Sequence, residues 1–467
     1  MDAQETEPGL VCFDPDLIRR YDGRGPRYTS YPTALQFDEE YTRAHYVADA
    51  RASNELARPL SLYVHIPFCQ TLCYYCGCNK IVTRNQARVA RYLESLHGEI
   101  DLQAALFDAT RAVEQLHFGG GTPTYLDRRQ LAELMQKLDD AFGLDNSDEH
   151  EFSIEVDPRS ADPERIGELA ALGFNRLSLG VQDFDEGVQK AVNREQSIED
   201  VQSLVDAAHA AGFRSISFDL IYGLPEQSVD SFTGTLDHVI AMRPDRLAVY
   251  NYAHLPERFK GQRLIDRAAI PSPDSKLLIL QRTVETLTAA GYRYIGMDHF
   301  ALPGDDLVTA QADGTLQRNF QGYSTHRQCD LVGLGMSSIG NIGDAFAQNV
   351  TTTMLYEAHI AAGELPIAKG IAVDEDDRMR AAAIQSLMCD DELQFSTFNE
   401  RFGIVFQQYF APQLERLRLL ENDGLVTIDA EHIAISAKGR LLLRNIAMIF
   451  DRYIAGELEN RRFSRAI

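Results

Sequence analysis

The sequence predicts an α/β protein built around a partial (β/α)6 TIM-like barrel of parallel strands. Two observations predict this fold. From residue 59 onward, short apolar runs alternate with amphipathic helical patterns, which is the order of repeated βαβ units. Polar and glycine-rich segments directly follow these runs, and sites in parallel α/β folds lie at the carboxyl ends of strands. The expected strands are Leu60–Ile66, Gln115–Phe118, Glu151–Val156, Arg176–Gly180, Ser215–Ile221 and Arg246–Tyr252, with helices near 86–107, 128–142, 162–172, 197–211 and 228–241.

The segment ahead of the first strand, residues 1–55, is expected to be an N-terminal extension. It starts with a loose stretch and a short helix, and a helical pattern over Phe37–Leu56 leads into the first strand. Between them, residues 21–34 contain two prolines, two glycines and three tyrosines, which predicts an extended, irregular stretch. One interpretation is a surface linker. The other is a grip on a carboxylated ring system, because guanidinium groups such as those of Arg24 and Arg27 bind carboxylates as forks.

The barrel domain is expected to span residues 56–365. After the sixth strand, a helix is predicted near 272–290 and a strand over Tyr292–Phe300. The run Cys329–Gly343 is rich in glycine and poor in charge. One interpretation is that its backbone closely approaches a bound ligand, and the other is that it forms a glycine-rich turn inside the core. The run alone does not favour either interpretation.

Residues 366–467 are expected to form a separate, mainly helical domain. Helical patterns are present over Asp374–Met388, Phe395–Glu421 and Leu441–Leu458, and a short hairpin lies between the second and the third. Helices followed by a small wing predict a winged-helix-like domain. We interpret it as a cover for the barrel rather than as a nucleic-acid reader, because the chain is strongly acidic.

Composition excludes several classes of function. The 467 residues carry a formal net charge of −24, which argues against a general nucleic-acid binder and requires a local basic patch for any anionic substrate. No apolar run is long enough for a membrane span, and the acidic N-terminus lacks a signal-peptide core. Seven cysteines, an odd number with four clustered, favour the reducing cytoplasm.

Four of the cysteines follow the first expected strand. Cys69, Cys73 and Cys76 are spaced C-x3-C-x2-C, and three thiolates can hold one corner of a cubic iron–sulfur cluster while the fourth iron stays open to a small ligand. A disulfide is disfavoured because nothing indicates secretion. Structural zinc usually takes two separated Cys/His pairs, and no C-x2-C or H-x3–5-H pattern follows, which leaves zinc as a minor alternative. Spacing alone does not separate Cys78 from a fourth ligand.

Further candidate residues follow the other strands. Gly119, Gly120 and Gly121, with Thr122 after them, form a turn that can receive an amino-acid moiety, although such turns also bind phosphates or nothing. Glu155, at a strand end, either pairs with an ammonium group or is solvated. Asp219 lies in a strongly apolar strand and is expected to be buried with a partner. Arg194 either binds a carboxylate or pairs with a surface acid such as Glu195.

Together these motifs resemble the radical S-adenosylmethionine enzymes and, within them, the oxygen-independent coproporphyrinogen III oxidases. The resemblance extends from about Ile18 to the end of the chain. It is carried by the segments Gly25–Ala34, Tyr63–Cys69, Cys76–Lys80, Gly119–Thr124, Asn193–Gln196, Gly296–Phe300 and Asn319–Tyr323.

The resemblance implies cofactors and residue roles. Cys69, Cys73 and Cys76 would hold a 4Fe–4S cluster, and one S-adenosylmethionine would bind its open iron while a second lies beside the first. Cys78 would not be a ligand but would matter for activity, and Tyr63 is placed with it among the catalytic residues. The S-adenosylmethionine sites would include Tyr63, Tyr75, Gly119, Gly120, Gly121, Thr122, Glu155 and Ile339 for the first, and Gln182, Arg194, Asp219 and Ala253 for the second.

The resemblance also implies the reaction. A 5′-deoxyadenosyl radical would take a hydrogen from the β-carbon of a propionate, and loss of CO₂ and an electron would leave a vinyl group. Two such conversions turn coproporphyrinogen III into protoporphyrinogen IX in haem biosynthesis. The expected partners are this substrate, gripped by Arg24 and Arg27, and a low-potential electron donor such as a flavodoxin-type protein, with a monomeric enzyme in the cytoplasm.

Two related functions remain as alternatives. A haem-trafficking relative with the same barrel would bind haem and transfer it. Such relatives lack a match to Cys78 and to the Arg/Tyr segment at residues 21–34, and this chain has both. A radical enzyme acting on another tetrapyrrole, such as a haem-degrading one, is the second alternative.

Overall fold

Twelve strands form one open sheet in the computed structural model, which describes residues 10–145, 147 and 149–454. The strand order is β16-β15-β14-β13-β1-β4-β5-β6-β7-β8-β10-β9. All six expected parallel strands are present, in chain order and side by side. They are β1 (Leu60–Ile66), β4 (Val113–Gly120), β5 (Glu151–Val156), β6 (Arg176–Gln182), β7 (Ser215–Tyr222) and β8 (Arg246–Asn251).

The sheet extends beyond these six strands on both sides, which the sequence did not predict. The glycine-rich run forms β13, which pairs in parallel with β1, and β14, which turns back against β13. The predicted strand Tyr292–Phe300 is instead a pair of short antiparallel strands. The added strands are β9 (Arg293–Gly296), β10 (His299–Ala301), β13 (Asp330–Leu334), β14 (Ile339–Ile342), β15 (Ala345–Asn349) and β16 (Ile367–Ala372). Because both edges stay apart, the barrel is partial, as predicted.

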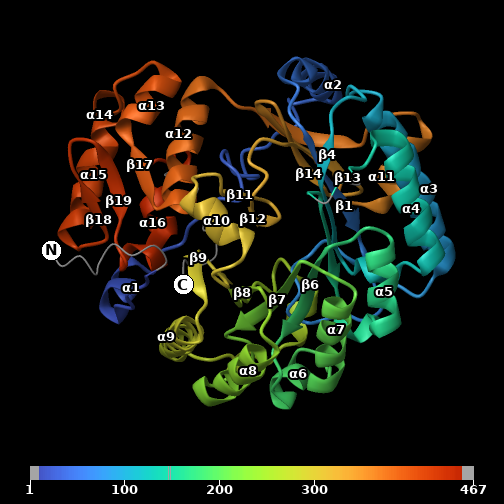
Figure 1. Ribbon diagram of the computed structural model, residues 1–467, viewed down its shortest axis with the longest axis horizontal. Helices are drawn as coiled ribbons and strands as arrows, with labels where there is room; N and C mark the ends of the chain where they lie inside the picture. The colour runs from blue at the N-terminus through green and yellow to red at the C-terminus, as the bar shows by residue number, and fades with distance from the viewer. Residues whose placement is uncertain (1–9, 146, 148, 455–467) are drawn as a thin grey trace.

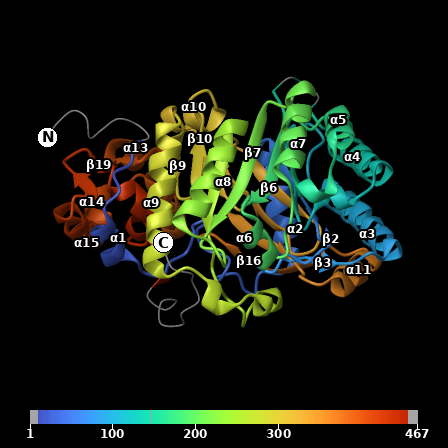
Figure 2. The same ribbon diagram turned by 90° about the horizontal axis from the view of Figure 1, so that it is seen from below.

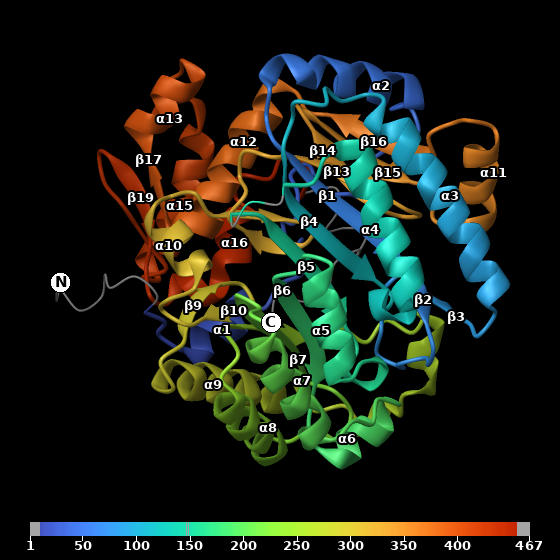
Figure 3. The same cartoon turned by 45° about the vertical axis from the view of Figure 1, so that its right-hand side comes forward.

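Helices cover the outer face of the sheet, and Figure 3 shows α3, α4 and α5 lying across the strands. Most begin at a residue whose side chain accepts a hydrogen bond from the first turn, such as Asp127 before α4 and Ser228 before α8. Helix α6, directly after β6, was not predicted. The helices around the sheet are α3 (Gln86–Ala104), α4 (Arg128–Phe142), α5 (Pro163–Ala171), α6 (Glu186–Ala191), α7 (Ile198–Ala210), α8 (Val229–Met242), α9 (Pro273–Ala289), α10 (Asp306–Ala312) and α11 (Thr353–Ala361).

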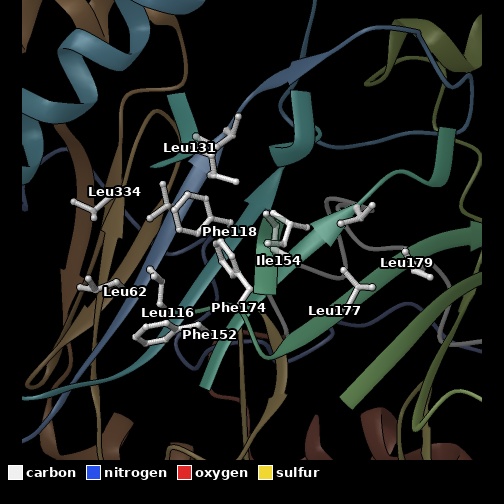
Figure 4. Packing of buried hydrophobic residues seen from close by; sticks show 14 of the residues in the cluster. Leu62, Leu116, Phe118, Leu131, Phe152, Ile154, Phe174, Leu177, Leu179 and Leu334 are labelled. Carbon is white, nitrogen blue, oxygen red and sulfur yellow. The ribbon is translucent and has the colours of Figure 1, made fainter. Parts of the chain in front are cut away.

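Successive side chains of each strand point to opposite faces of the sheet, so one face packs in the core and the other faces the barrel interior. On the outer face, Leu62 is paired in register with Leu116, and Phe118 with Ile154, and these apolar side chains pack under the helices. Figure 4 shows Leu131 of α4 close to this layer. On the inner face, the alternate positions are polar. They include Tyr63, His65, His117, Ser153, Glu155, Ser178, Ser217 and Asp219.

The C-terminal part forms a second core, at the left of Figure 1. The predicted helix over Phe395–Glu421 is three helices, because the chain turns at Gly403 with φ +66° and again before Ala411. The wing has a third strand from an unexpected segment. The elements are α12 (Glu375–Gln385), α13 (Phe395–Phe402), α14 (Phe406–Tyr409), α15 (Ala411–Asn422) and α16 (Leu443–Ala447), with β17 (Glu392–Gln394), β18 (Val426–Ile428) and β19 (His432–Ile435).

The predicted final helix Leu441–Leu458 is shorter in the structure. It consists of a 3-10 turn over Gly439–Leu442 followed by α16, which ends at Ala447. Residues 455–458 of that prediction lie outside the described residues.

The N-terminal segment links the two cores instead of forming a surface linker. Its helices are α1 (Pro15–Tyr21) and α2 (Arg43–Ala52). Between them, Tyr28 and Tyr31 are 2 % and 4 % exposed and pack in the C-terminal core, where Tyr28 Oη donates to Asp451 at 2.9 Å. Figure 2 shows this N-terminal chain running from α1 toward the sheet.

The large sheet takes in residues that lie past position 365. Strand β16 pairs with β15, and its Gly370 also bridges to Asp38 of the N-terminal segment. The sheet therefore extends to Ala372. Two short pairs complete the strands. β2 (Phe68–Cys69) pairs in parallel with β3 (Ile81–Val82), and β11 (Gln317–Asn319) pairs antiparallel with β12 (Gly322–Ser324). Within the described part of the chain, no helix combines the length and apolarity that a membrane span needs.

Candidate active site

The cysteine loop leaves the carboxyl end of β1 and closes over one end of the barrel. Cys69, Cys73 and Cys76 all line one cavity of about 440 Å³. The loop is tied down from the segment after α6, since Tyr74 N–H donates to the Val192 carbonyl at 3.0 Å and Asn193 Nδ2 donates to the Leu72 carbonyl at 2.8 Å. All three cysteines are free thiols.

Polar and charged side chains lie beside the three sulfurs. Nη2 of Arg159 lies 3.2 Å from the Cys73 sulfur, and Nη1 of Arg194 lies 3.5 Å from it. A hydrogen bond from the Cys78 thiol, and also the Lys80 ammonium, lower the pKa of Cys76 to about 5 although burial opposes this. Burial raises the pKa of Cys69 to about 11, but a bound metal deprotonates its own thiol ligands. Three sulfurs that line one cavity beside two guanidinium groups fit a 4Fe–4S cluster.

The glycine turn at the end of β4 forms another wall. Gly120 has φ +114°, and a Cβ there would lie 2.6 Å from the His65 ring. A Cβ on Gly121 would lie 2.7 Å from the Pro67 carbonyl oxygen, and one on Gly119 would lie 3.1 Å from both Tyr63 and Glu155. These close approaches require glycine. They leave an open backbone edge in the cavity, where Thr122 Oγ1 also donates to the Cys69 sulfur at 3.5 Å.

Glu155 is a partnered carboxylate at the end of β5. Its Oε2 accepts the Gly120 N–H at 3.1 Å, and its Oε1 lies 3.4 Å from His117 Nε2. Burial opposes its ionisation, but the hydrogen bonds from His117 and Gly120 lower the pKa of Glu155. The Tyr63 ring stacks on His117 with centroids 5.8 Å apart. An ionised carboxylate at this place can bind an ammonium group.

Arg194 pairs with Asp157 rather than with the neighbouring Glu195. Its Nη1 donates to Asp157 at 3.0 Å, and a second guanidinium nitrogen donates to the Gly180 carbonyl. The Arg194 Nε is buried and has no partner among the described residues, which fits a ligand beside it. The sequence did not single out Asp157 or Arg159, because pairing between separate strand ends leaves no local pattern.

Gln182 and Asp219 line the same cavity as Arg194. The β6–β7 register shifts between Gly180 and Gln182, and Gln182 has φ +67°. Asp219 is half-buried rather than buried, and it accepts a hydrogen bond from Ser178 Oγ at 3.2 Å, so the expected partner is present. Burial, and then the nearby Glu155, raise the pKa of Asp219 to about 7.

Two further residues of the cavity wall, Phe259 and Gln262, were not predicted from the sequence. Gln262 Nε2 donates to the Tyr75 carbonyl at 2.9 Å and to the Ala253 carbonyl at 3.2 Å, so it joins two predicted residues. Phe259 packs against Gly77. Thirteen predicted residues line the cavity, namely Cys69, Cys73, Tyr75, Cys76, Cys78, Gly120, Gly121, Thr122, Glu155, Gln182, Arg194, Asp219 and Ala253. Tyr63, Gly119 and Ile339 lie outside its lining, with Ile339 backed against Gly333 in β13.

A second cavity, of about 420 Å³, adjoins the first. The two cavities share Asn251, Tyr252 and Ala253 at the end of β8. Arg24 and Arg27 line the second cavity and not the first. Its cationic side chains are Arg19, Arg24, Arg27, Arg267, Lys276 and Arg444, against the carboxylates Asp22, Asp274 and Asp298.

Arg27 is already held in place within this second cavity. It forms an ion pair with Asp298, and its guanidinium lies 5.3 Å from the centroid of the Tyr250 ring. Burial opposes the charge of Asp298, but Arg27 and then Arg318 lower the pKa of Asp298. The pair therefore stays charged, with Arg27 fixed in orientation.

The fold and the three-cysteine loop define a radical S-adenosylmethionine enzyme. Residues 63–239 match the family model of the Radical SAM superfamily, and residues 373–442 match that of the HemN C-terminal domain. The chain is 54 % identical over 460 residues to the oxygen-independent coproporphyrinogen III oxidase of Pseudomonas aeruginosa, covering 98 % of this chain and 99 % of the relative. It belongs to the oxygen-independent coproporphyrinogen III oxidase family.

Two further comparisons agree with that assignment. The oxygen-independent coproporphyrinogen III oxidase of Escherichia coli is 49 % identical over 457 residues, with 98 % of this chain and 99 % of the relative covered. The solved structure of coproporphyrinogen III oxidase (HemN) from Escherichia coli, described as a radical SAM enzyme, superposes with a TM-score of 0.90 at 47 % identity. It covers 95 % of this chain and 100 % of the other.

Proposed function

We infer that the chain oxidatively decarboxylates two propionates of coproporphyrinogen III to vinyl groups and so forms protoporphyrinogen IX in haem biosynthesis. One observation carries this inference. The cavity lined by the three cysteines adjoins an arginine-rich cavity. The two cavities share Asn251, Tyr252 and Ala253 in their walls. Radical generation and binding of a polycarboxylate are thereby adjacent, as this reaction requires.

The three cysteines are the proposed ligands of the cluster. Cys69, Cys73 and Cys76 would hold three of the four irons of a 4Fe–4S cluster. When bound, the cluster and S-adenosylmethionine supply the 5′-deoxyadenosyl radical that takes the β-hydrogen of a propionate. Arg159 and Arg194 balance sulfur charge near Cys73. Cys78, hydrogen-bonded to Cys76, acts from beside the ligands without joining them.

The first S-adenosylmethionine is proposed to lie along the glycine turn. Open backbone at Gly119, Gly120 and Gly121, followed by Thr122, suits its amino-acid end. The ionised Glu155 suits its ammonium group. Tyr75 lines the cavity beside it, while Tyr63 and Ile339 support the glycine turn and β13 from behind.

The second S-adenosylmethionine is proposed to contact Gln182, Arg194, Asp219 and Ala253. Gln182 ends β6, Arg194 follows α6, Asp219 lies within β7 and Ala253 follows β8, and all four line the cavity. The guanidinium group of Arg194 can pair with the carboxylate of this S-adenosylmethionine. Its buried Nε has no hydrogen-bond partner among the described residues. Asp219, with its raised pKa, can hold a proton near neutral pH.

Substrate carboxylates are proposed to bind at Arg24 and Arg27. A chain with net charge −24 repels a polyanion unless positive charge is concentrated locally, and six cations against three carboxylates line this cavity. Loss of the β-hydrogen, CO₂ and one electron gives each vinyl group.

The proposed setting of the enzyme follows from the same features. We propose a monomer in the cytoplasm that takes electrons from a low-potential donor such as a flavodoxin-type protein. Seven free thiols support a reducing compartment.

Anaerobic turnover tests the proposed function. The reconstituted protein is incubated with coproporphyrinogen III, S-adenosylmethionine and a low-potential reductant. We expect protoporphyrinogen IX together with 5′-deoxyadenosine. Absence of both products would refute the proposal, 5′-deoxyadenosine without the vinyl product would indicate another substrate, and tight haem binding without turnover would indicate haem transfer.

A further inference from the structure

A second group of metal-ligating side chains lies at the opposite end of the strands from the cysteine cavity. Glu114 is the second residue of β4, whereas Gly120 is the last. They are six residue steps apart along the strand, which is about 20 Å at roughly 3.3 Å per residue. His326 and Cys329 lie in the loop between β12 and β13, spaced H-x2-C. This group therefore does not belong to the site described above.

The three ligand atoms converge. One oxygen of Glu114, one ring nitrogen of His326 and the Cys329 sulfur all lie within 4.8 Å of one another. Glu114 Oε2 is the common point, 3.7 Å from His326 Nδ1 and 3.7 Å from Cys329 Sγ. Side chains from two segments that lie more than 200 residues apart thus meet at one carboxylate oxygen.

The His326–Glu114 separation matches a metal site better than a direct contact, whereas the Cys329 thiol already donates a hydrogen bond to Glu114 Oε2. A nitrogen–oxygen distance of 3.7 Å exceeds the reach of an ordinary hydrogen bond. Zinc–ligand bonds of about 2.0–2.3 Å in a tetrahedron place neighbouring ligand atoms about 3.3–3.6 Å apart. Small rotations of the His326 and Cys329 side chains would bring the group to that geometry.

Neighbouring polar groups orient two of the ligands. Glu151 Oε2 lies 3.8 Å from His326 Nε2, so a carboxylate faces the ring nitrogen that would not bind the metal. Glu151 is itself held by Arg176 Nε at 2.8 Å. Gln328 Nε2 donates to Glu114 Oε2 at 3.1 Å. A carboxylate behind a histidine ligand is a recurrent feature of zinc sites, where it fixes the tautomer.

We propose that Glu114, His326 and Cys329 bind one Zn²⁺ ion. Thiolate, imidazole and carboxylate are the donors that zinc takes in proteins. The Cys329 thiol proton passes to solvent when the metal–sulfur bond forms. Water takes the fourth position on the side of Glu114, whose side chain is 35 % exposed. The ion ties the chain entering β13 to the start of β4, and so stabilises the end of the barrel remote from the reaction.

Zinc binding is measured on the full-length protein with its iron–sulfur cluster in place. The anaerobic protein is titrated with Zn²⁺ against a chromophoric chelator, and the zinc K-edge absorption spectrum reports the ligands without interference from iron. We expect one zinc per chain with one sulfur at about 2.3 Å and nitrogen or oxygen at about 2.0–2.1 Å. Cys329→Ser and His326→Gln should each weaken binding by about 100-fold or more, beyond the roughly 10- to 100-fold cost of losing an outer partner.

Cys12→Ser is the matched thiol control, because Cys12 is a free, exposed cysteine outside the group. It should leave the zinc affinity unchanged, and added Zn²⁺ should raise the melting temperature of this control but not that of Cys329→Ser. A spectrum with three sulfurs would place zinc at the cluster cysteines and overturn the proposal. Equal zinc affinity in Cys329→Ser and Cys12→Ser, or no binding at micromolar Zn²⁺, would overturn it as well.

Discussion

Arg194 donates from one guanidinium nitrogen to both the Asp157 carboxylate, at 3.0 Å, and the Cys73 sulfur, at 3.5 Å. The same side chain also reaches the Gly180 carbonyl at the end of β6. One residue therefore connects a proposed cluster ligand with the wall proposed for the second S-adenosylmethionine. We expect the positive charge of Arg194 to affect the reduction potential of the cluster, and its planar guanidinium group to position S-adenosylmethionine.

Replacing Arg194 separates these two effects. Arg194→Lys keeps the charge but loses the planar fork, so we expect a KM for S-adenosylmethionine about tenfold higher with a little-changed cluster potential. Arg194→Gln also removes the charge and should shift the potential to more negative values. Steady-state kinetics and spectroscopic redox titration measure the two effects. Equal potentials in Arg194→Gln and in the surface control Arg129→Gln would contradict this account.

Cys69→Ser should abolish cluster assembly. Two remaining thiolates hold a 4Fe–4S cluster poorly, and the Cys69 sulfur lines the cavity beside Thr122. We expect iron and acid-labile sulfide to fall to a small fraction of wild type after anaerobic reconstitution, and 5′-deoxyadenosine formation to be lost. Cys12→Ser, at an exposed cysteine, should keep full iron content. Full iron content in Cys69→Ser would remove Cys69 from the ligand set.

Glu155→Gln should weaken S-adenosylmethionine binding by a factor that does not vary with pH. A hydrogen bond to a charged group contributes about 1.5–3 kcal/mol, which corresponds to about 10- to 150-fold in affinity. The folded pKa of Glu155 is below its ordinary 4.5, so its stabilising charge is present above that value and is lost only as pH falls through the lower, folded pKa. Calorimetric titration between pH 6 and 8 checks this. A wild-type to Gln ratio that changes across the range would show that Glu155 titrates there.

Glu99 makes folding stability decrease with rising pH. It is fully buried and accepts from Gly335 N–H, Asn349 Nδ2 and Tyr356 Oη, yet burial raises its pKa to about 7. Because the folded pKa is above the unfolded one, the stability from the bound proton is present below about pH 4.5 and is lost as pH rises through about 7. Thermal unfolding at pH 5.5 and pH 8 should show a larger loss for wild type than for Glu99→Gln. Parallel losses would contradict the raised pKa.

Arg27→Ala should weaken substrate binding without affecting S-adenosylmethionine. Arg27 lies in the second cavity, fixed by Asp298, so its removal takes away a proposed carboxylate partner and leaves Asp298 without this ion pair. We expect the KM for coproporphyrinogen III to rise about tenfold or more, equivalent to about 1.4 kcal/mol. Arg27→Lys, which keeps Asp298 paired, separates this effect from misfolding and should show a smaller increase. An unchanged KM in Arg27→Ala would exclude the role.

The sequence predicted the six central strands because each is a short apolar run bounded by a helical pattern. It also predicted the cysteine cavity, since residues after parallel strands meet at one end. Strands β13 and β14 were missed because Gly333 in β13 and Gly340 in β14 weaken the strand pattern, although a Cβ at either would clash with backbone.

Partners that meet only through the fold were also missed. Asp157 and Arg159 contact Arg194 and Cys73 across strand ends, and His117 reaches Glu155 from a neighbouring strand. Tyr28 and Tyr31 were assigned to an irregular segment, and only the C-terminal core explains their burial. Such contacts depend on register and long-range packing, which no local pattern encodes.

Transfer of a substrate hydrogen to 5′-deoxyadenosine is the most direct test of hydrogen abstraction from the propionate β-carbon. Coproporphyrinogen III carrying deuterium at the propionate β-carbons is incubated anaerobically with the reconstituted enzyme, S-adenosylmethionine and a low-potential reductant, and the nucleoside is analysed by mass spectrometry. We predict deuterium-labelled 5′-deoxyadenosine formed together with the vinyl product. Unlabelled 5′-deoxyadenosine accompanying vinyl formation would contradict this prediction.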